Sequence, residues 1–364
     1  MTQELLERTA AADEMTGIVD CDIHPSFVTR NDLASFLPQC WREHVRDYGM
    51  RTANPTLGAL PYPRINDAMR RDSYPPEGGM PGSSLSFMRE HLLDPLNIEV
   101  GILQPIGPGG ATFNLELGVA VSSAMNDWQA EVWLSKEKRL KGSIQITQEN
   151  TAASVREIEA RARDRRFVQI AMPPRTIEPS GRERYWPIYE AAESLGLPIG
   201  MHPVPAGTHA NTPAGWTSFY IEEHYSNAHP PQSALVSMIF EGVFERFPKL
   251  KLVLIEGGFG WLAPLMWRMD REWERLRGEV PHIKMKPSEY VRRNVWLTTQ
   301  PVEEPINVRH MTNLLKWIGT DRLMFSTDYP HWDFDHPDRA FRVSLTPQEK
   351  QAIFRDNARA VFPL

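Results

Sequence analysis

The stretch KLVLIEGGFGWLAPLMW, residues 251–267, shows in one place the strand, turn and helix that alternate along the whole chain. Residues 251–256 form an apolar run that predicts a strand, two adjacent glycines predict a turn, and a helix is expected from residue 260. The apolar run is continuous, which is typical of a parallel strand that is buried on both faces. Because Glu256 and the glycines interrupt it, the stretch does not read as a membrane span.

The same alternation of strand and helix continues from one end of the chain to the other. Apolar runs predict strands at residues 17–22, 98–104, 141–146, 167–172, 197–202, 251–256, 294–299 and 322–328. Helices are expected at residues 115–137, 151–164, 184–195, 231–246, 260–277, 303–316 and 335–344. Eight strands in alternation with helices predict an α/β fold, a single closed (β/α)8 TIM barrel. An open doubly wound sheet is the alternative, but no G-x-G-x-x-G motif follows the first strand.

Two segments are too long for a minimal barrel. We interpret residues 1–16 as an N-terminal arm and residues 17–364 as the barrel, with residues 23–97 as a cap inserted after the first strand. A second long loop, residues 203–230, follows the fifth strand. Both leave the carboxyl ends of strands, where barrel active sites lie, so they are expected to form lids. The alternative is that both are ordinary surface loops.

The pocket is expected to be covered by particular parts of these segments. Residues 50–85 are rich in proline, and residues 205–229 carry several aromatic side chains. We predict that both stretches lie over the carboxyl ends of the strands and are more mobile than the barrel.

The composition is that of a folded protein whose main partner is not nucleic acid. Hydrophobic residues make up 41% and charged residues 24% of the 364 residues, which excludes wholesale disorder. The formal net charge of −6 argues against binding to phosphate backbones, which requires a basic face. A small-molecule substrate is therefore the expected partner.

The cysteines and the N-terminus favour a cytoplasmic location. Cys21 and Cys40 are too few to form a disulfide framework, and no Cys-x-x-Cys pair predicts a structural zinc site. Residues 1–15 are acidic and lack the apolar segment of a signal peptide. We expect no contact with membranes.

Metal-ligating residue types stand at the ends of three predicted strands. Asp22 and His24 end the first strand two residues apart, a spacing that places both side chains on one face. His202 ends the fifth strand and Asp328 ends the eighth. In a closed barrel these four side chains converge, and imidazole with carboxylate suits one divalent ion, zinc first, with manganese or iron as alternatives. Taken singly, such a histidine is more often a hydrogen-bonded core residue and such an aspartate a helix cap.

The sequence resembles the amidohydrolase-related family, the branch of the amidohydrolase superfamily that contains the aminocarboxymuconate-semialdehyde and resorcylate decarboxylases. The resemblance covers residues 17–362 and rests on IVDCDIHPSF, RYWPIYEAAESLGLPIGMHP, EGVFERFPKLKLVLIEGGFGWLAPLMWRMD and LMFSTDYPH. It implies a barrel with one divalent metal. The family's His-x-His or Glu-x-His motif corresponds here to Asp22-Ile23-His24, its fifth-strand histidine to His202, and its eighth-strand aspartate to Asp328. The resemblance gives Asp328 a catalytic role, as a metal ligand or a carrier of a proton.

The end of the sixth strand departs from the family pattern. Many relatives have a histidine there, in a His-Gly-Gly-like turn, whereas this chain has Glu256-Gly257-Gly258. A glutamate near a metal is expected to stay ionised, because its ordinary pKa is near 4.3. We therefore predict that Glu256 is catalytic and acts as a base or as a further ligand. The alternative is an acceptor that caps the turn into the next helix.

Four residues are candidates for substrate binding. Arg175 follows the fourth strand and could bind a carboxylate with two hydrogen bonds. His331 lies three residues after Asp328, and Trp216 and His224 lie in the long loop after the fifth strand, where they could line the pocket. For each of them the alternative is a surface or packing role.

Three functions agree with these features. The first is a metal-dependent non-oxidative decarboxylase of a small aromatic or unsaturated carboxylic acid, a planar substrate. The second is a metal-dependent hydrolase of an amide, a lactone or an activated C–C bond that uses a metal-bound water, a role that the carboxylate of Glu256 suits. The third, a metal-binding barrel without activity, is the weakest. The chain is expected to form a homo-oligomer, a dimer in the first instance.

Overall fold

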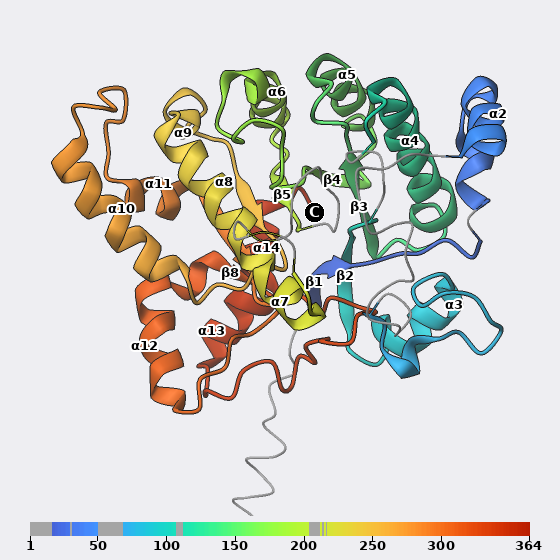
Figure 1. Cartoon of the computed structure of the whole chain (residues 1–364). Coiled ribbons are helices and arrows are strands. Elements are labelled where there is room, and N and C mark those ends of the chain that lie inside the picture. The colour runs from blue at the N-terminus through green and yellow to red at the C-terminus, as the bar shows by residue number, and fades with distance from the viewer. Residues whose placement is uncertain are drawn as a thin grey trace, which may run out of the picture.

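The computed structural model describes residues 17–29, 31–49, 68–106, 112–203, 212, 215 and 217–364. At its centre eight parallel strands follow one another in chain order (Figure 1). They are β1 (Ile18–Ile23), β2 (Ile98–Leu103), β3 (Leu140–Gln145), β4 (Phe167–Ala171), β5 (Ile199–Met201), β6 (Leu252–Leu254), β7 (Val295–Thr298) and β8 (Leu323–Met324). Backbone hydrogen bonds from Cys21 N to Phe325 O and from Asp328 N to Asp22 O join the eighth strand to the first, so the barrel is nearly closed.

All eight expected strands are confirmed, and most are shorter than the apolar runs that predicted them. The run at residues 322–328, for example, pairs only at Leu323–Met324. Residues 325–328 follow the paired part of the strand, are still buried, and include Asp328 at the end of the run. The (β/α)8 barrel expected from the alternation is therefore the observed architecture.

The helices lie around the outside of the strands (Figure 1). They are α2 (Gln39–Tyr48), α3 (Leu85–Met88), α4 (Leu115–Trp128), α5 (Thr151–Arg161), α6 (Trp186–Leu195), α7 (Tyr220–Tyr225), α8 (His229–Phe240), α9 (Val243–Arg246), α10 (Leu262–Leu276), α11 (Pro287–Asn294), α12 (Val308–Ile318), α13 (Pro347–Gln351) and α14 (Asn357–Val361). α11 was not expected from the sequence. The helix expected at residues 335–344 is wrong, because these residues form turns. Pro337 disfavours a helix there, and the Asp335 carboxylate accepts a hydrogen bond from Val302 N of the neighbouring loop.

The insertion after β1 returns to the barrel beside the last strand. Met69 forms an antiparallel bridge with His331. Arg70 N donates to Pro330 O, and Trp332 N donates to Ala68 O. The described end of the insertion is thus paired with the loop that follows β8, which we call the eighth loop (residues 328–335).

Apolar side chains on the strands and the surrounding helices form the core. The larger cluster packs strand residues such as Ile144 and Leu254 against helix residues such as Leu235 and Met266. Fully burying one such side chain contributes about 1.5–3 kcal/mol to the free energy of unfolding. The polar residues described below come at or just after the strand ends, so packing and chemistry use largely different residues.

Two further features are the hydropathy of the helices and the state of the two cysteines. Within the described ranges, no helix combines the length and the hydropathy that a membrane crossing requires. Cys21 is buried, Cys40 is exposed, and both are free thiols.

Candidate metal centre and active site

The ends of four strands bring five metal-ligating side chains together. Asp22 belongs to β1, and His24, His202, Glu256 and Asp328 follow β1, β5, β6 and β8. His24 Nε2 lies 3.3 Å from Asp22 Oδ1 and 2.9 Å from Asp328 Oδ1. His202 Nε2 lies 3.6 Å from Asp22 Oδ2 and 2.6 Å from Glu256 Oε2. All five are buried. The structure therefore brings together the four predicted ligands and Glu256.

The ring of His24 is oriented by the backbone. Its Nδ1 donates to the carbonyl oxygen of Gln104 at 2.7 Å. In the neutral imidazole the other nitrogen, Nε2, then carries a lone pair. That lone pair faces the carboxylate oxygens of Asp22 and Asp328, an arrangement of acceptors against acceptors that a cation would stabilise. A partner of this kind on the second nitrogen is typical of a metal-ligating histidine.

Several buried atoms of this cluster have no hydrogen-bond partner among the described residues. They are both carboxylate oxygens of Asp22, Nε2 of His24 and both ring nitrogens of His202. Buried polar atoms are normally satisfied, so a group of unsatisfied ones that face each other requires an explanation. Ligand atoms from Asp22, His24, His202 and Glu256 all lie within 4.8 Å of one another, as do those from His24, Glu256, Asp328 and His331. This donor set fits a divalent ion.

The electrostatics of the cluster lead to the same conclusion. Burial, and then the negative charges of Asp328 and Glu256, raise the pKa of Asp22 well above its ordinary value. Burial, followed by the nearby imidazoles of His331 and His202, lowers the pKa of His24 well below its ordinary value. A bound cation would offset the repulsion between the carboxylates, and unprotonated imidazoles are able to bind it.

The turn after β6 aims Glu256 at His202. Glu256 adopts a left-handed backbone with φ of 50°, and Gly258 follows with φ of 62°. Glu256 N donates to Thr298 Oγ1 at 3.0 Å. Glu303 accepts a hydrogen bond from Gly260 N. A Cβ on Gly258 or on Gly260 would collide with the Glu303 carboxylate. A left-handed non-glycine residue costs about 1 kcal/mol or more, and such residues cluster at functional sites.

Asp328 is held in a similar strained conformation, with φ of 60°. Thr327, the residue before it, donates to the Asp20 carboxylate from its backbone nitrogen at 2.9 Å and from its hydroxyl at 2.5 Å. Asp20 also accepts from Asp22 N at 3.2 Å. Burial raises the pKa of Asp20 to about 7. Sequence reasoning missed Asp20, although the alternation Asp20, Asp22, His24 in DCDIH could have indicated it.

A second set of polar contacts surrounds the cluster. His331 Nδ1 lies 2.6 Å from Asp328 Oδ1. Burial opposes a charge on His331, but the Asp328 carboxylate outweighs it and raises the pKa of His331 to about 9. His224 Nε2 lies 3.2 Å from Asp333 Oδ2, and Gln300 Nε2 donates to Asp333 Oδ2 at 2.8 Å. Asp333 and Gln300 carried no motif that sequence reasoning could have used.

A family model described as Amidohydrolase matches residues 19–364. The chain belongs to this amidohydrolase family. A gamma-resorcylate decarboxylase from Polaromonas sp. (strain JS666) is 26% identical over 292 residues, which cover 76% of this chain and 86% of the relative. A 2-amino-3-carboxymuconate-6-semialdehyde decarboxylase from Dictyostelium discoideum is 24% identical over 57% of this chain and 55% of its own length.

Solved structures share the fold of this chain. A 5-carboxyvanillate decarboxylase from Sphingomonas paucimobilis has a TM-score of 0.71 at 21% identity, with 96% of this chain and 99% of that chain covered. A dihydroxybenzoic acid decarboxylase from Polaromonas sp. JS666, with bound manganese and the inhibitor 2-nitroresorcinol, has a TM-score of 0.66 at 20% identity. It covers 95% of this chain and 97% of that chain.

The predicted substrate-binding residues lie in different environments. His331 and His224 lie beside the cluster, as described above. Arg175 is half-buried, and its pKa is lowered by burial, an effect that the Glu223 carboxylate opposes. Trp216 lies outside the described residues.

Helix α7 is attached to the eighth loop by aromatic side chains as well as by His224. Trp332 Nε1 donates to the hydroxyl of Tyr220 at 2.9 Å. The His224 ring lies 5.6 Å from the Tyr220 ring and 5.4 Å from the Trp332 ring, measured between centroids. On the same helix, the neighbouring side chains of Ile221 and Tyr225 are exposed. The described part of the long loop after β5 therefore contacts the eighth loop next to Asp328.

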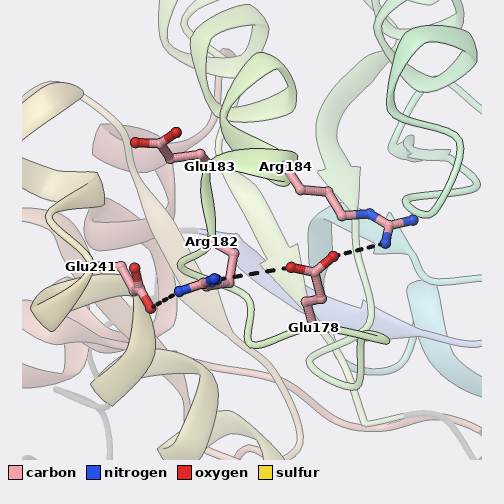
Figure 2. A pocket seen from close by; sticks show the side chains of 5 residues that line it. All are labelled: Glu178, Arg182, Glu183, Arg184 and Glu241. Atoms are coloured by element: carbon pink, nitrogen blue, oxygen red, sulfur yellow. Dashed lines mark hydrogen bonds and ion pairs between the residues drawn. The ribbon is translucent and has the colours of Figure 1, made fainter.

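A surface hollow elsewhere on the molecule has a different character. It has a volume of about 360 Å³ and is lined by Glu178, Arg182, Glu183, Arg184 and Glu241. Figure 2 shows Glu178 between the two arginines, with Arg182 also directed at Glu241. Four of these five charged side chains are paired with one another, and the hollow contains no histidine or other metal-ligating cluster, so we assign the chemistry to the strand ends.

Asp335, at the end of the eighth loop, provides a test of the electrostatics outside the ligand cluster. Burial raises its pKa to about 7. The folded protein therefore holds a proton on Asp335 that the unfolded chain releases near pH 4, and this contribution to stability falls as the pH rises from about 4 to about 7. In Asp335→Asn this pH-dependent loss of stability disappears because an amide does not titrate. The amide oxygen can still accept the hydrogen bond from Val302 N. We expect the variant to be more stable than the wild type by about 1 to 4 kcal/mol at pH 8.

The measurement is the melting temperature of both proteins at pH 4.5, 6 and 8 by calorimetry. The difference in favour of Asp335→Asn should grow across this series. A difference that is independent of pH would show that Asp335 is ionised throughout and that burial does not dominate its pKa.

Proposed function

We propose that this protein is a metal-dependent non-oxidative decarboxylase of a small hydroxylated aromatic carboxylic acid. The observation that carries the proposal is the buried cluster of three carboxylates and two imidazoles, whose unpartnered atoms face one another at the strand ends. The gamma-resorcylate decarboxylases among its relatives support the reaction class. Their substrate is planar and anionic, which agrees with the imidazole and aromatic groups of His331, His224 and Trp332 near the cluster.

One divalent ion would be held by Asp22, His24, His202 and Asp328, with Glu256 as a neighbour or a fifth ligand. When bound, it supplies positive charge that binds a substrate carboxylate and an adjacent hydroxyl oxygen. Three carboxylates in the set suit manganese better than a set of imidazoles would. Manganese is also bound in the Polaromonas dihydroxybenzoic acid decarboxylase. We therefore propose manganese first, and the zinc expected from the sequence stays a prediction for metal analysis to test.

The chain's own residues would carry the proton. Decarboxylation replaces the carboxylate on a ring carbon with a hydrogen, so one proton is consumed and one CO₂ leaves. In the proposed mechanism the carboxyl group of Asp328 delivers this proton to the ring carbon, the bond from the ring to the carboxylate breaks, and its electron pair returns to the ring. His331, whose Nδ1 lies 2.6 Å from Asp328 Oδ1, is placed to pass the next proton to Asp328.

Substrate recognition is proposed for the groups around the cluster. Arg175 offers a guanidinium for a second oxygen substituent or for the carboxylate. His224, whose pKa is raised mainly by its hydrogen bond to Asp333, offers a cationic imidazole between Tyr220 and Trp332. Trp216 stays a candidate from the sequence alone. The homodimer and the cytoplasmic location likewise stay predictions.

The test is a turnover assay of the purified, metal-loaded protein with 2,6-dihydroxybenzoate and 5-carboxyvanillate in H₂¹⁸O. We expect one CO₂ for each aromatic product and no ¹⁸O in that product. A chelator should abolish turnover, and Mn²⁺ should restore it. Failure to release CO₂ from either acid or from a panel of hydroxybenzoates would contradict the proposal.

A hydrolase is the second candidate, and the carboxylate of Glu256 favours it. Glu256 can abstract a proton from water, and its Oε2 lies next to His202. Incorporation of ¹⁸O from solvent into the product of an amide or lactone would identify this reaction in place of the decarboxylation.

A further inference from the structure

Gln300, which follows β7, contacts two different carboxylates of the site. Its Nε2 donates to Asp328 Oδ2 at 3.1 Å and to Asp333 Oδ2 at 2.8 Å, and the second of these N–H groups also lies near the Asp333 carbonyl oxygen, 3.3 Å from Nε2. The side chain is fully buried. Its backbone nitrogen donates to Ser326 Oγ at 3.3 Å, which fixes the start of the side chain against the β8 segment.

The orientation of this amide is determined by its neighbours. A primary amide nitrogen has two hydrogens, and here one is available for each carboxylate. The opposite orientation would place Oε1, an acceptor, against two carboxylate oxygens. In the observed orientation Oε1 is buried without a hydrogen-bond partner among the described residues. The two bonds to carboxylates are therefore what retains a buried glutamine at this place.

The bond to Asp328 separates the roles of its two oxygens. Oδ1 lies 2.9 Å from His24 Nε2 and 2.6 Å from His331 Nδ1, on the side of the ligand cluster. Oδ2 is occupied by Gln300. A donor on Oδ2 resists rotation of the carboxylate about its terminal bond, so Oδ1 stays directed at the cluster.

The hydrogen bond from Gln300 to Asp333 connects the Asp328 carboxylate to helix α7. Asp333 Oδ2 lies 3.2 Å from His224 Nε2, so the contacts form a continuous series from His224 through Asp333 and Gln300 to Asp328. We propose that Gln300 is a positioning residue that holds Asp328 Oδ1 toward the metal and the substrate, and that it does so only when Asp333 holds its other N–H. The effect on turnover rests on the proposed function; the effect on metal coordination does not.

Gln300→Met tests the first half of this proposal, because methionine keeps the length of the side chain and removes both donors. Removal of an outer partner of a ligand typically costs 10- to 100-fold in metal affinity or activity. We expect kcat to fall by about tenfold or more with KM changed less than about threefold, because the substrate contacts are kept. We also expect the visible absorption spectrum of the Co²⁺-loaded protein to shift.

Gln129→Met is the matched control. Gln129 is also buried, but it donates to Ser143 O and Asn126 Oδ1, away from the cluster. This variant should lower the melting temperature and leave the Co²⁺ spectrum and kcat near those of the wild type. Should Gln300→Met fail to fold, Gln300→Asn withdraws the amide by one methylene and should change the spectrum in the same direction. A wild-type spectrum with kcat within threefold in a folded Gln300 variant would overturn the proposal.

A double-mutant cycle with Asp333→Asn tests the second half. If Asp333 acts through Gln300, the loss of kcat in the double variant should be clearly smaller than the product of the two single losses. Losses that multiply would overturn the link between Asp333 and Gln300. If the wild type releases no CO₂, the proposed function fails, whereas the Co²⁺ spectra of the variants still decide whether Gln300 positions Asp328.

Discussion

His202→Ala should abolish turnover and release the metal while the barrel stays folded. His202 follows the short strand β5 and lies between Asp22 and Glu256, with both ring nitrogens buried and without hydrogen-bond partners among the described residues. Its removal takes one of two imidazoles from the ligand set and leaves the carboxylates facing each other. We expect metal content well below one ion per chain and no detectable CO₂ release.

The fold should survive this substitution because the core lies elsewhere. Met201, the preceding residue, packs in the large apolar cluster and is not changed. Metal analysis, the circular dichroism spectrum and turnover are measured together. His310→Ala, at an exposed position on α12, is the control and should match the wild type in all three. A fully active, metal-free His202→Ala protein would show that the cluster is not a metal site.

The barrel could be predicted because each strand has a recognisable pattern in its own local sequence. Runs such as KLVLIE are continuously apolar, a pattern that requires burial on both faces and therefore helices on the outside. Once the strands form a closed barrel, the residues at their carboxyl ends must meet. The convergence of Asp22, His24, His202 and Asp328 followed from that geometry and not from any one motif.

Other contacts could not be predicted because they depend on how distant segments align. Gln300 and Asp333 are 33 residues apart, and their hydrogen bond exists only because the β7 and β8 ends lie side by side. Residues 335–344 contain charged and apolar residues at helical spacing, yet their turns are fixed by a bond between Asp335 and the loop after β7. Tertiary contacts of this kind override local propensity.

Helix α11 is a different case, since its start signals stand in the sequence. Pro287 occupies the first turn, and Glu289 accepts a hydrogen bond from Lys286 N at 2.8 Å. A proline at the first position with glutamate soon after it is typical of a helix start. The helix has only eight residues and follows the much longer α10, in a stretch for which the sequence predicted no element.

Glu256→Gln should lower turnover by about 10²-fold or more, the usual scale for loss of a proton-transferring group. Glutamine keeps the shape of the side chain, and its amide oxygen can still accept from Asn227 Nδ2, which donates to Glu256 Oε1 at 3.3 Å. The substitution removes the negative charge 2.6 Å from His202 Nε2. Turnover and metal content are measured on the same preparation. Glu303→Gln is the matched control, because Glu303 is a carboxylate beside the same turn that accepts from Gly260 N.

The two measurements together separate the possible roles of Glu256. If turnover falls and the metal stays, Glu256 moves a proton and the other four side chains suffice to hold the ion. If both fall, Glu256 is a ligand, and its carboxylate stands where many relatives use a histidine. Glu303→Gln should lower the melting temperature without a comparable loss of turnover, since its carboxylate stabilises the turn and does not contact the cluster. Near-full turnover in Glu256→Gln would show that Glu256 is only an acceptor for Asn227 and has no catalytic role. Its strained backbone and its place 2.6 Å from His202 Nε2 argue for the catalytic role, because an acceptor for Asn227 requires neither.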